Sequence, residues 1–183
     1  MAALLTALPA LCEEQQIRLD PANTKVEWTL GTVLHTVHGT FRLKRGDLHL
    51  DPAAGKISGQ IVVDATSGES GSGARDSRMH KSILESGKYP EIVFAPDRIV
   101  GALKPYGDSD IQLHGSFTIH GAAHEVTLAA RVHLEGPRLA TELNFTVPYI
   151  QWGMKNPSTL FLRVDDTVRI TVRAAGDVTV ASH

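Results

Sequence analysis

Residues 125–134 read EVTLAARVHL, and every second residue of this stretch is apolar. The alternating apolar residues are Val126, Leu128, Ala130, Val132 and Leu134. Successive side chains of a β-strand point to opposite faces, so a period of two gathers all of them on one face. A strand with one apolar and one mainly polar face is typical of an antiparallel sheet that covers a core on one side. The stretch therefore predicts a half-buried antiparallel strand.

The same alternation recurs at short intervals along the chain. The other alternating segments are 25–31, 37–43, 56–65, 90–100, 114–121, 141–149 and 159–175. Most breaks between them contain Gly, Pro or Asp, which suit turns, and five such turns are expected at 44–47, 51–56, 104–110, 120–125 and 135–138. The pattern predicts an all-β protein of about eight antiparallel strands around one core.

Length and composition narrow the class of protein. A chain of 183 residues suits a single domain, and 42% apolar with 21% charged residues is ordinary for a soluble globular protein. The net charge of −2 gives no basic surface for nucleic acid, so we expect no nucleic-acid partner. Aromatic residues make up only 5%, so the interior must consist mainly of Val, Ile, Leu and Ala.

The first sixteen residues differ from the rest. Residues 1–16 contain a short apolar run that resembles the apolar region of a secretory signal but is too short to span a bilayer. We interpret them as either a signal-peptide remnant or a disordered tail, and the first reading predicts a periplasmic or secreted protein. Cys12 is the single cysteine and follows Pro-Ala-Leu, so a lipid anchor on it is a further alternative.

One segment breaks the period of two. Between residues 74 and 86 the apolar residues are Met79, Ile83 and Leu84, a spacing that fits one face of a helix better than a strand. Gly87 can adopt the left-handed conformation that ends helices, and Pro90 prevents continuation. We predict one short helix around residues 75–86, placed over an open barrel end or a sheet edge.

Three motifs carry a resemblance to a known family. They are VEWTLGTVLHTVHGTF at 26–41, RDSRMHKSILESGKYPEIVF at 75–94 and LHGSFTIHGAAHEVTLAARV at 113–132. In their order and spacing they resemble the YceI-like family over roughly residues 17–175. The His of the second motif is displaced from the usual family position. On this basis we assign residues 17–180 to one YceI-like lipid-binding domain.

The resemblance implies an extended, lipocalin-like, eight-stranded antiparallel barrel whose lumen holds a polyisoprenoid, in a non-enzymatic protein that is periplasmic or secreted. An eight-stranded barrel is either filled by side chains or wide enough for one slender ligand. Gly39, Gly59 and Ala130, small residues at positions predicted to face inward, favour an unfilled lumen. The same small residues are also expected at barrel bends.

The predicted ligand is an isoprenoid or quinone-like lipid, with no metal or other cofactor. Its candidate binding residues are the apolar residues that face inward from the strands, the helix residues over the barrel end and one aromatic residue of the loop at 148–159. They are Trp28, Leu30, Phe41, Ile61, Val63, Arg75, Met79, His80, Ile83, Phe94, Phe117, Ile119, Leu128, Phe145, Val147 and Trp152. Peripheral membrane contact and a homodimer are further expectations.

The polar candidates have structural alternatives. Arg75 or His80 could meet a polar or phosphate head group at the barrel mouth, since arginine suits phosphate. Equally, Arg75 could pair with Asp76 to fix the chain corner, and His80 could donate to a backbone carbonyl. Trp152 could line the barrel entrance or belong to a plain hairpin loop.

Two other functions stay open at this stage. One is a structural or stress-response interaction module with a filled core, and the other is a metal- or haem-linked redox accessory protein that uses some of the nine histidines. Asp76 and His80 also have the spacing of a partial catalytic relay, but no G-x-S-x-G motif accompanies them. We therefore predict no enzymatic activity.

Overall fold

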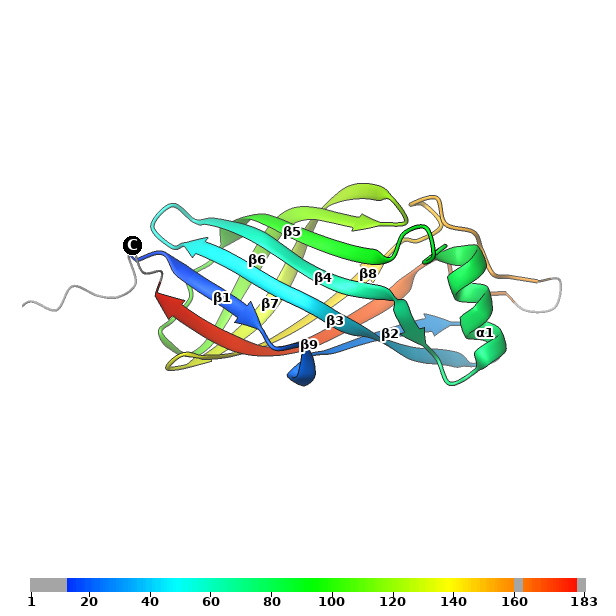
Figure 1. Ribbon diagram of the computed structural model, residues 1–183, viewed down its shortest axis with the longest axis horizontal. Helices are drawn as coiled ribbons and strands as arrows, with labels where there is room; N and C mark the ends of the chain where they lie inside the picture. The colour runs from blue at the N-terminus through cyan, green and yellow to red at the C-terminus, as the bar shows by residue number, and fades with distance from the viewer. Residues whose placement is uncertain (1–12, 160–162, 181–183) are drawn as a thin grey trace, which may run out of the picture.

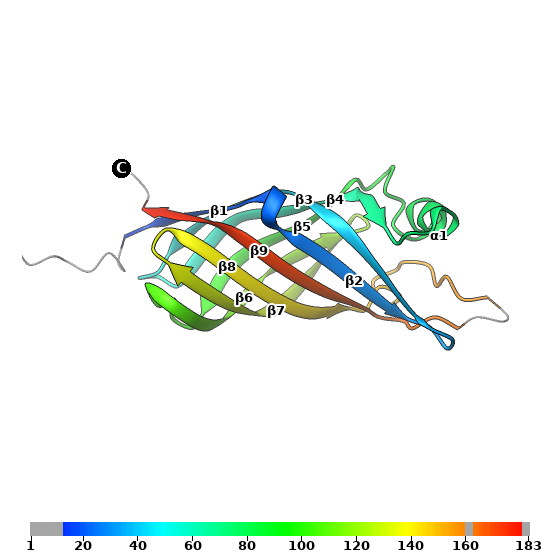
Figure 2. The same ribbon diagram turned by 90° about the horizontal axis from the view of Figure 1, so that it is seen from below.

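The alternating segments form nine antiparallel strands, which wrap into one elongated barrel in the computed structural model of the protein (Figures 1 and 2). The structure describes residues 13–159 and 163–180. The strands are β1 Gln15–Leu19, β2 Lys25–Gly31, β3 Thr36–Asp51, β4 Lys56–Glu69, β5 Glu91–Val100, β6 Tyr106–Ile119, β7 Ala122–Glu135, β8 Arg138–Val147 and β9 Val168–Val180.

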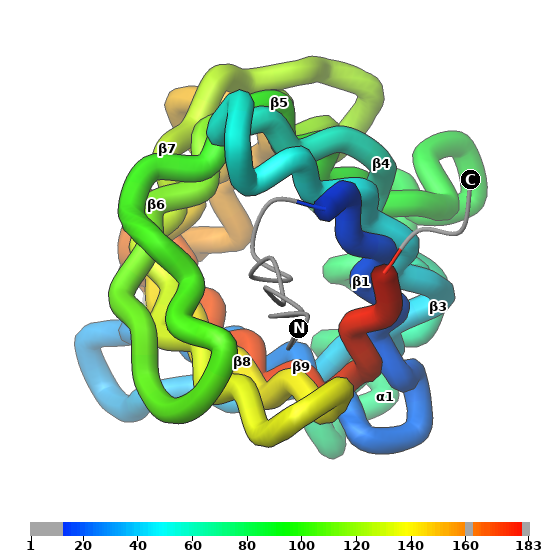
Figure 3. The backbone as a smooth tube through the Cα atoms, turned by 90° about the vertical axis from the view of Figure 1, so that its left-hand side faces the viewer, coloured from blue at the N-terminus to red at the C-terminus, as the bar shows by residue number. Residues whose placement is uncertain are grey.

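The barrel closes through pairing of β3 with β4, as the view along its axis shows (Figure 3). The order around the wall is β3-β2-β9-β8-β7-β6-β5-β4, so the predicted eight-stranded antiparallel barrel is confirmed. β1 and β2 occupy one position between β3 and β9 and are separated by a 3-10 turn, Pro21–Asn23. β1 begins at Gln15, two residues before the domain start expected from the sequence.

The turn predicted at residues 44–47 is wrong. β3 runs without reversal from Thr36 to Asp51, and its pairing with β4 shifts register between Leu43 and Arg45. A β-bulge bends a strand but does not reverse it, so a Gly- and Asp-containing stretch is compatible with continued pairing. Gly46 lies against Leu19, whose side chain would be 2.7 Å from a Cβ at position 46, so close packing rather than a turn accounts for this glycine.

The predicted helix is present over one end of the barrel. α1 spans Gly73–Arg78 and continues into a π-helical turn, Met79–Ile83, at the right in Figure 1. The helical path ends at Glu85, which adopts the left-handed conformation with φ of 47°, and not at Gly87 as expected. The backbone carbonyl of Glu85 accepts from the amides of Lys88 and Tyr89, so the chain already reverses there.

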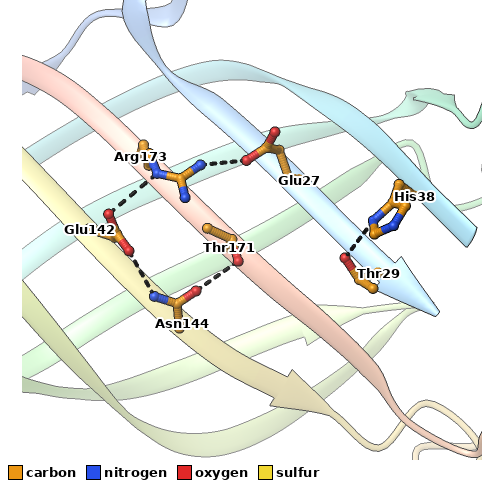
Figure 4. Close-up of polar contacts among 7 residues, drawn as sticks. All are labelled: Glu27, Thr29, His38, Glu142, Asn144, Thr171 and Arg173. Atoms are coloured by element: carbon orange, nitrogen blue, oxygen red, sulfur yellow. Dashed lines mark hydrogen bonds and ion pairs between the residues drawn. The ribbon is translucent and has the colours of Figure 1, made fainter. Parts of the chain in front are cut away.

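The outer face of the barrel is polar and is linked across strands. In Figure 4, Arg173 of β9 reaches Glu27 of β2 at 2.7 Å and Glu142 of β8 at 3.3 Å. The hydroxyl of Thr171 donates to Asn144 at 2.7 Å. Exposed pairs of this kind contribute little each, and here they link the side chains of β8, β9 and β2 across the wall.

The inner face is packed unevenly along the barrel. At the end away from α1, inward residues such as Leu50, Ile57 and Ile111 are buried against one another. Toward α1, inward residues such as Ile61, Phe145 and Ile170 keep partial exposure although they point into the barrel. The core is therefore packed more densely in one half and hollow in the other.

Candidate ligand-binding cavity

A cavity of about 670 Å³ occupies the hollow half of the barrel and reaches the end that α1 partly covers. Its wall is made of aliphatic and aromatic side chains from the strands, from α1 and from the π-helical turn. The polar residues among those that line it come mainly from the α1 end: Thr32, His35, Ser72, Arg75 and Arg78. An apolar chamber with a polar mouth suits a long apolar ligand that carries a polar end group.

Fourteen of the sixteen candidate residues line this cavity. They are Trp28, Leu30, Phe41, Ile61, Val63, Arg75, Met79, Ile83, Phe94, Phe117, Ile119, Leu128, Phe145 and Val147. Period-two alternation placed the strand residues, because inward and outward positions follow directly from strand geometry. Their contact with a ligand stays a prediction.

The sequence reasoning left several lining residues out of the candidate set. The additional residues from the strands are Val26, Val37, Ile92, Leu143, Val168, Ile170 and Val172. Most of them show the same alternation, so the period would have included them. Tyr149, Met154, Pro157 and Val164 come from the irregular chain after β8, where no period exists to place a side chain.

A deeper cavity of about 100 Å³ shares part of its lining with the larger one, and we call the shared side chains the waist. Val172 of β9 pairs in register with Val26 of β2 and Leu143 of β8, and all three line both cavities. Ile61 of β4 and Phe94 of β5 pair with each other and also line both. These five side chains come from strands on different parts of the wall and face the lumen between the two cavities.

The small residues that suggested an open lumen have different structural roles. A Cβ at Gly39 would lie 2.3 Å from ring carbons of Trp28, so this glycine makes room for the indole. A Cβ at Gly59 would lie 2.2 Å from the carbonyl oxygen of Asp47, and the backbone of Gly59 has φ of 107°. This glycine therefore fits the alternative of a barrel bend. Ala130 is buried in the packed half.

His80 does not line the cavity, and its ring is fully engaged by the protein. Nε2 lies 2.8 Å from the carbonyl oxygen of Gly68, which can only accept, so Nε2 carries the proton. Nδ1 lies 2.8 Å from the hydroxyl of Ser86. The backbone alternative for His80 is the one observed. Asp76 and His80 do not contact each other, so no relay forms between them.

Arg75 and Asp76 fix the corner before α1 through a shared partner rather than through each other. The Arg75 guanidinium donates to the Ser70 hydroxyl at 2.7 Å and to the Ser70 carbonyl at 2.9 Å. The Ser70 hydroxyl in turn donates to the carboxylate of Asp76. The side chain of Arg75 still lines the cavity, as does that of Arg78.

Trp152 lies behind the cavity wall. Its ring stacks on that of His124, with 4.1 Å between the ring centroids. The centroid of the Phe117 ring, which does line the cavity, lies 5.8 Å away. The neighbouring Met154 is buried and faces the lumen. The irregular chain after β8 therefore contributes Met154 to the cavity wall, and Trp152 supports this wall from behind.

Two residues in the left-handed conformation join the helical segment to the β6–β7 turn. Glu85, with φ of 47°, and His120, with φ of 52°, contact each other at 2.6 Å. The hydrogen bond from His120 holds the pKa of Glu85 below its ordinary value. The ring of Tyr89 lies 4.9 Å from that of His120. This contact ties the segment over the cavity to the barrel rim.

Tyr149 anchors the chain on the other side of the mouth. Its hydroxyl donates to the carbonyl oxygen of Asp165 at 2.7 Å. Burial, together with the nearby carboxylates of Asp166 and Asp165, raises the pKa of Tyr149 to about 12. The phenol stays neutral and keeps this hydrogen bond over the whole physiological pH range.

Across residues 13–159 and 163–180, one group of three side chains could in principle hold a metal ion: Asp97, His114 and Glu125. His114 Nδ1 lies 2.8 Å from Asp97, and its Nε2 lies 3.7 Å from Glu125, so the carboxylates bind opposite ring nitrogens. None of these residues lines either cavity. We interpret the group as polar contacts of the outer wall.

Comparison with known proteins agrees with this architecture. Residues 18–175 match the family model described as YceI-like domain. BcnA of Burkholderia cenocepacia is similar in structure, with a TM-score of 0.70, 20% identity and coverage of 86% of this chain and 98% of that one. A polyisoprenoid binding domain from Saccharophagus degradans, implicated in plant cell wall breakdown, gives a TM-score of 0.70 at 15% identity, covering 89% and 98%.

The YceI protein of Campylobacter jejuni is also similar, with a TM-score of 0.54 at 15% identity and coverage of 76% and 80%. No curated protein sequence matches the chain. In the part of the chain that the structure describes, no helix has the length and apolar character needed to cross a membrane.

Proposed function

The chain belongs to the YceI-like domain family, and from this premise we propose that it binds a polyisoprenoid or similar long apolar lipid in the barrel lumen and transports or stores it. The observation that carries the proposal is the apolar cavity of about 670 Å³ inside the barrel. The similar domain from Saccharophagus degradans, a polyisoprenoid binding domain, supports this ligand class.

The cavity wall supplies the free energy of binding. A prenyl chain gains about 25 cal/mol for each Å² of apolar surface that leaves water, and the ordering of the chain offsets part of this gain. Such binding needs no catalytic group, only a continuous apolar wall. Among the polar lining residues, the charged side chains are at the mouth, so the ligand's apolar tail lies deep and its head group lies near α1.

Arg75 and Arg78 are the groups that would meet the head group. Both line the cavity, and neither forms an ion pair with a carboxylate in the described chain. Guanidinium groups donate several hydrogen bonds in a fixed plane, which suits a phosphate or the oxygens of a quinone-like ring. Arg78→Gln would weaken retention of a lipid with an anionic head group more than retention of a lipid with a quinone-like head group, because only the anionic head group loses an attraction between charges.

The hollow half of the barrel favours lipid binding over an interaction module with a filled core. The described histidines do not gather around the lumen: His35 alone lines the cavity, which gives no support to a haem or redox centre there. Export to the periplasm or the exterior, suggested by residues 1–16, belongs to the same proposal; Cys12 lies outside the described residues. Homodimer formation stays a prediction.

Mass spectrometry of an organic extract of the purified protein tests the proposal. We expect a stoichiometric prenyl or quinone-like lipid, and a protein stripped of lipid should take up an added polyprenyl lipid. A protein that is empty when purified and also fails to bind added polyprenyl lipid would refute it. Metal analysis of the same sample tests the redox alternative.

A further inference from the structure

The β2–β3 turn carries two exposed apolar side chains at the mouth of the cavity. Val33 is 73% exposed and Leu34 is 75% exposed. The central positions of a tight turn are commonly Gly, Asn, Asp, Ser or Pro, so Val-Leu is an unusual choice for contact with water. Figure 2 shows this hairpin at the end of the barrel that also carries α1.

The turn is held firmly in place. The Thr32 amide donates to the carbonyl oxygen of His35 at 3.0 Å. The Thr32 hydroxyl donates to the same carbonyl at 2.6 Å and accepts from the His35 amide at 3.0 Å. The amide of Val33 donates to the carbonyl oxygen of Arg163 at 3.2 Å, which ties the turn to the chain before β9. Thr32 and His35 line the cavity, so the two exposed residues lie directly beside its opening.

The segments that connect the strands at the same end carry a net positive charge, whereas the chain as a whole is negative. Segments 31–36, 70–90, 120–121, 148–159 and 163–167 contain six Lys or Arg and four Asp or Glu, whereas the whole chain contains 18 and 20. The cations are Arg75, Arg78, Lys81, Lys88, Lys155 and Arg163. In the described chain none of them forms an ion pair, while three of the four carboxylates accept from protein donors.

From these features we propose that the α1 end docks on a lipid bilayer that contains anionic lipid. Val33 and Leu34 enter the acyl boundary, and the surrounding cations contact the anionic head groups. Apolar insertion and attraction of basic residues act together in this kind of binding. Docking in this orientation places the cavity mouth against the membrane, so a lipid can pass between bilayer and lumen; that use of the surface rests on the proposed function.

A flotation assay with vesicles tests the docking surface. The wild-type protein should bind vesicles of phosphatidylcholine and phosphatidylglycerol in equal parts, and bind vesicles of phosphatidylcholine alone more weakly. Val33→Ser with Leu34→Ser should lower partitioning onto the anionic vesicles by roughly a hundredfold, because two apolar side chains no longer leave water. Lys81→Gln with Arg163→Gln should lower it by roughly tenfold, and high salt should weaken the wild type similarly.

Matched variants at the opposite end serve as controls. Val100 and Tyr106 are 53% and 71% exposed and lie at the other end of the barrel, so their replacement by Ser should leave vesicle binding unchanged. Lys56→Gln with Arg138→Gln is the corresponding control for charge. All altered side chains are exposed, so melting temperatures should match the wild type.

Three results would overturn the docking proposal. The first is equal vesicle binding by the turn variant and its control, and the second is no binding by the wild type. The third is a wild-type dimer in sedimentation analysis that the turn variant converts to a monomer, since a second copy would then cover the turn. Uptake of a polyprenyl lipid added in detergent, without any membrane, reports separately on the proposed function, and the turn variant stripped of lipid should equal the wild type in this measurement.

Discussion

Replacement of Val172 by Trp would obstruct the lumen at its waist. Val172 lies between Val26 and Leu143 in register, and the three side chains line both the large cavity and the deeper one. An indole at this position extends into space that is empty in the wild type, so the barrel should still fold. The lipid chain, however, loses the waist and the chamber of about 100 Å³ beyond it.

The expected loss of affinity follows from the displaced carbon atoms. One isoprene unit has five carbons, and burial contributes about 0.8 kcal/mol for each, so displacement of a single unit costs about 4 kcal/mol. The displaced part of the lipid chain keeps its conformational freedom, and this entropy offsets part of the lost binding free energy. Because about 1.4 kcal/mol corresponds to a factor of ten, the dissociation constant should rise by about two to three orders of magnitude.

Competition with a fluorescent prenyl probe would measure the change, with the lipid content of the purified variant as a second readout. Val180→Trp is the matched control, since Val180 lies on the same strand but is 48% exposed and lines neither cavity. If Val172→Trp keeps the affinity and lipid content of the wild type, the bound chain does not cross the waist and the reasoning fails.

Three further perturbations test other parts of the structure. Gly39→Ala should lower stability by about 1–3 kcal/mol in a denaturant titration, because its Cβ would lie 2.3 Å from the Trp28 ring, whereas Gly73→Ala, with no atom within 4 Å, should not. Glu85 has a lowered pKa, so its contact with His120 stabilises the protein above the ordinary value of 4.5 and is lost as pH falls; the difference in melting temperature between wild type and Glu85→Gln should therefore shrink below that pH. Removal of bound lipid should lower the melting temperature by about 5–10 °C, given about 2.7 kcal/mol from a ligand at a hundred times its dissociation constant, and an unchanged value in calorimetry would speak against a lumen ligand.

The strands and the facing of their side chains could be predicted because a period of two has a direct geometric meaning. Phe117 and Leu128 lie where alternation placed them, and the helix spacing of Met79 and Ile83 put both over the lumen. The same rule applied along β9 would have added Ile170.

Other features depend on contacts between segments far apart in sequence. The stretch 44–47 has the composition of a turn, yet pairing with β4 and packing of Gly46 on Leu19 keep it in a strand. The helix ends at Glu85, where the backbone is left-handed and the side chain contacts His120, 35 residues away. Local patterns cannot show such partners.

Candidates outside regular structure were the least certain for the same reason. For Trp152 the barrel entrance and a plain hairpin loop were open alternatives, because nothing in an irregular segment fixes which way a side chain points; in the structure the ring stacks on His124. His80 had two open alternatives, and the positions of Gly68 and Ser86 decide between them.

A crystal structure of the protein after incubation with a polyprenyl lipid tests the central claim most directly. The account predicts continuous density for one chain along the lumen, past Val172 at the waist, with the head group beside Arg75 and Arg78. An empty lumen in crystals whose dissolved protein still contains the lipid, or density for the chain on the outer wall of the barrel, would contradict it.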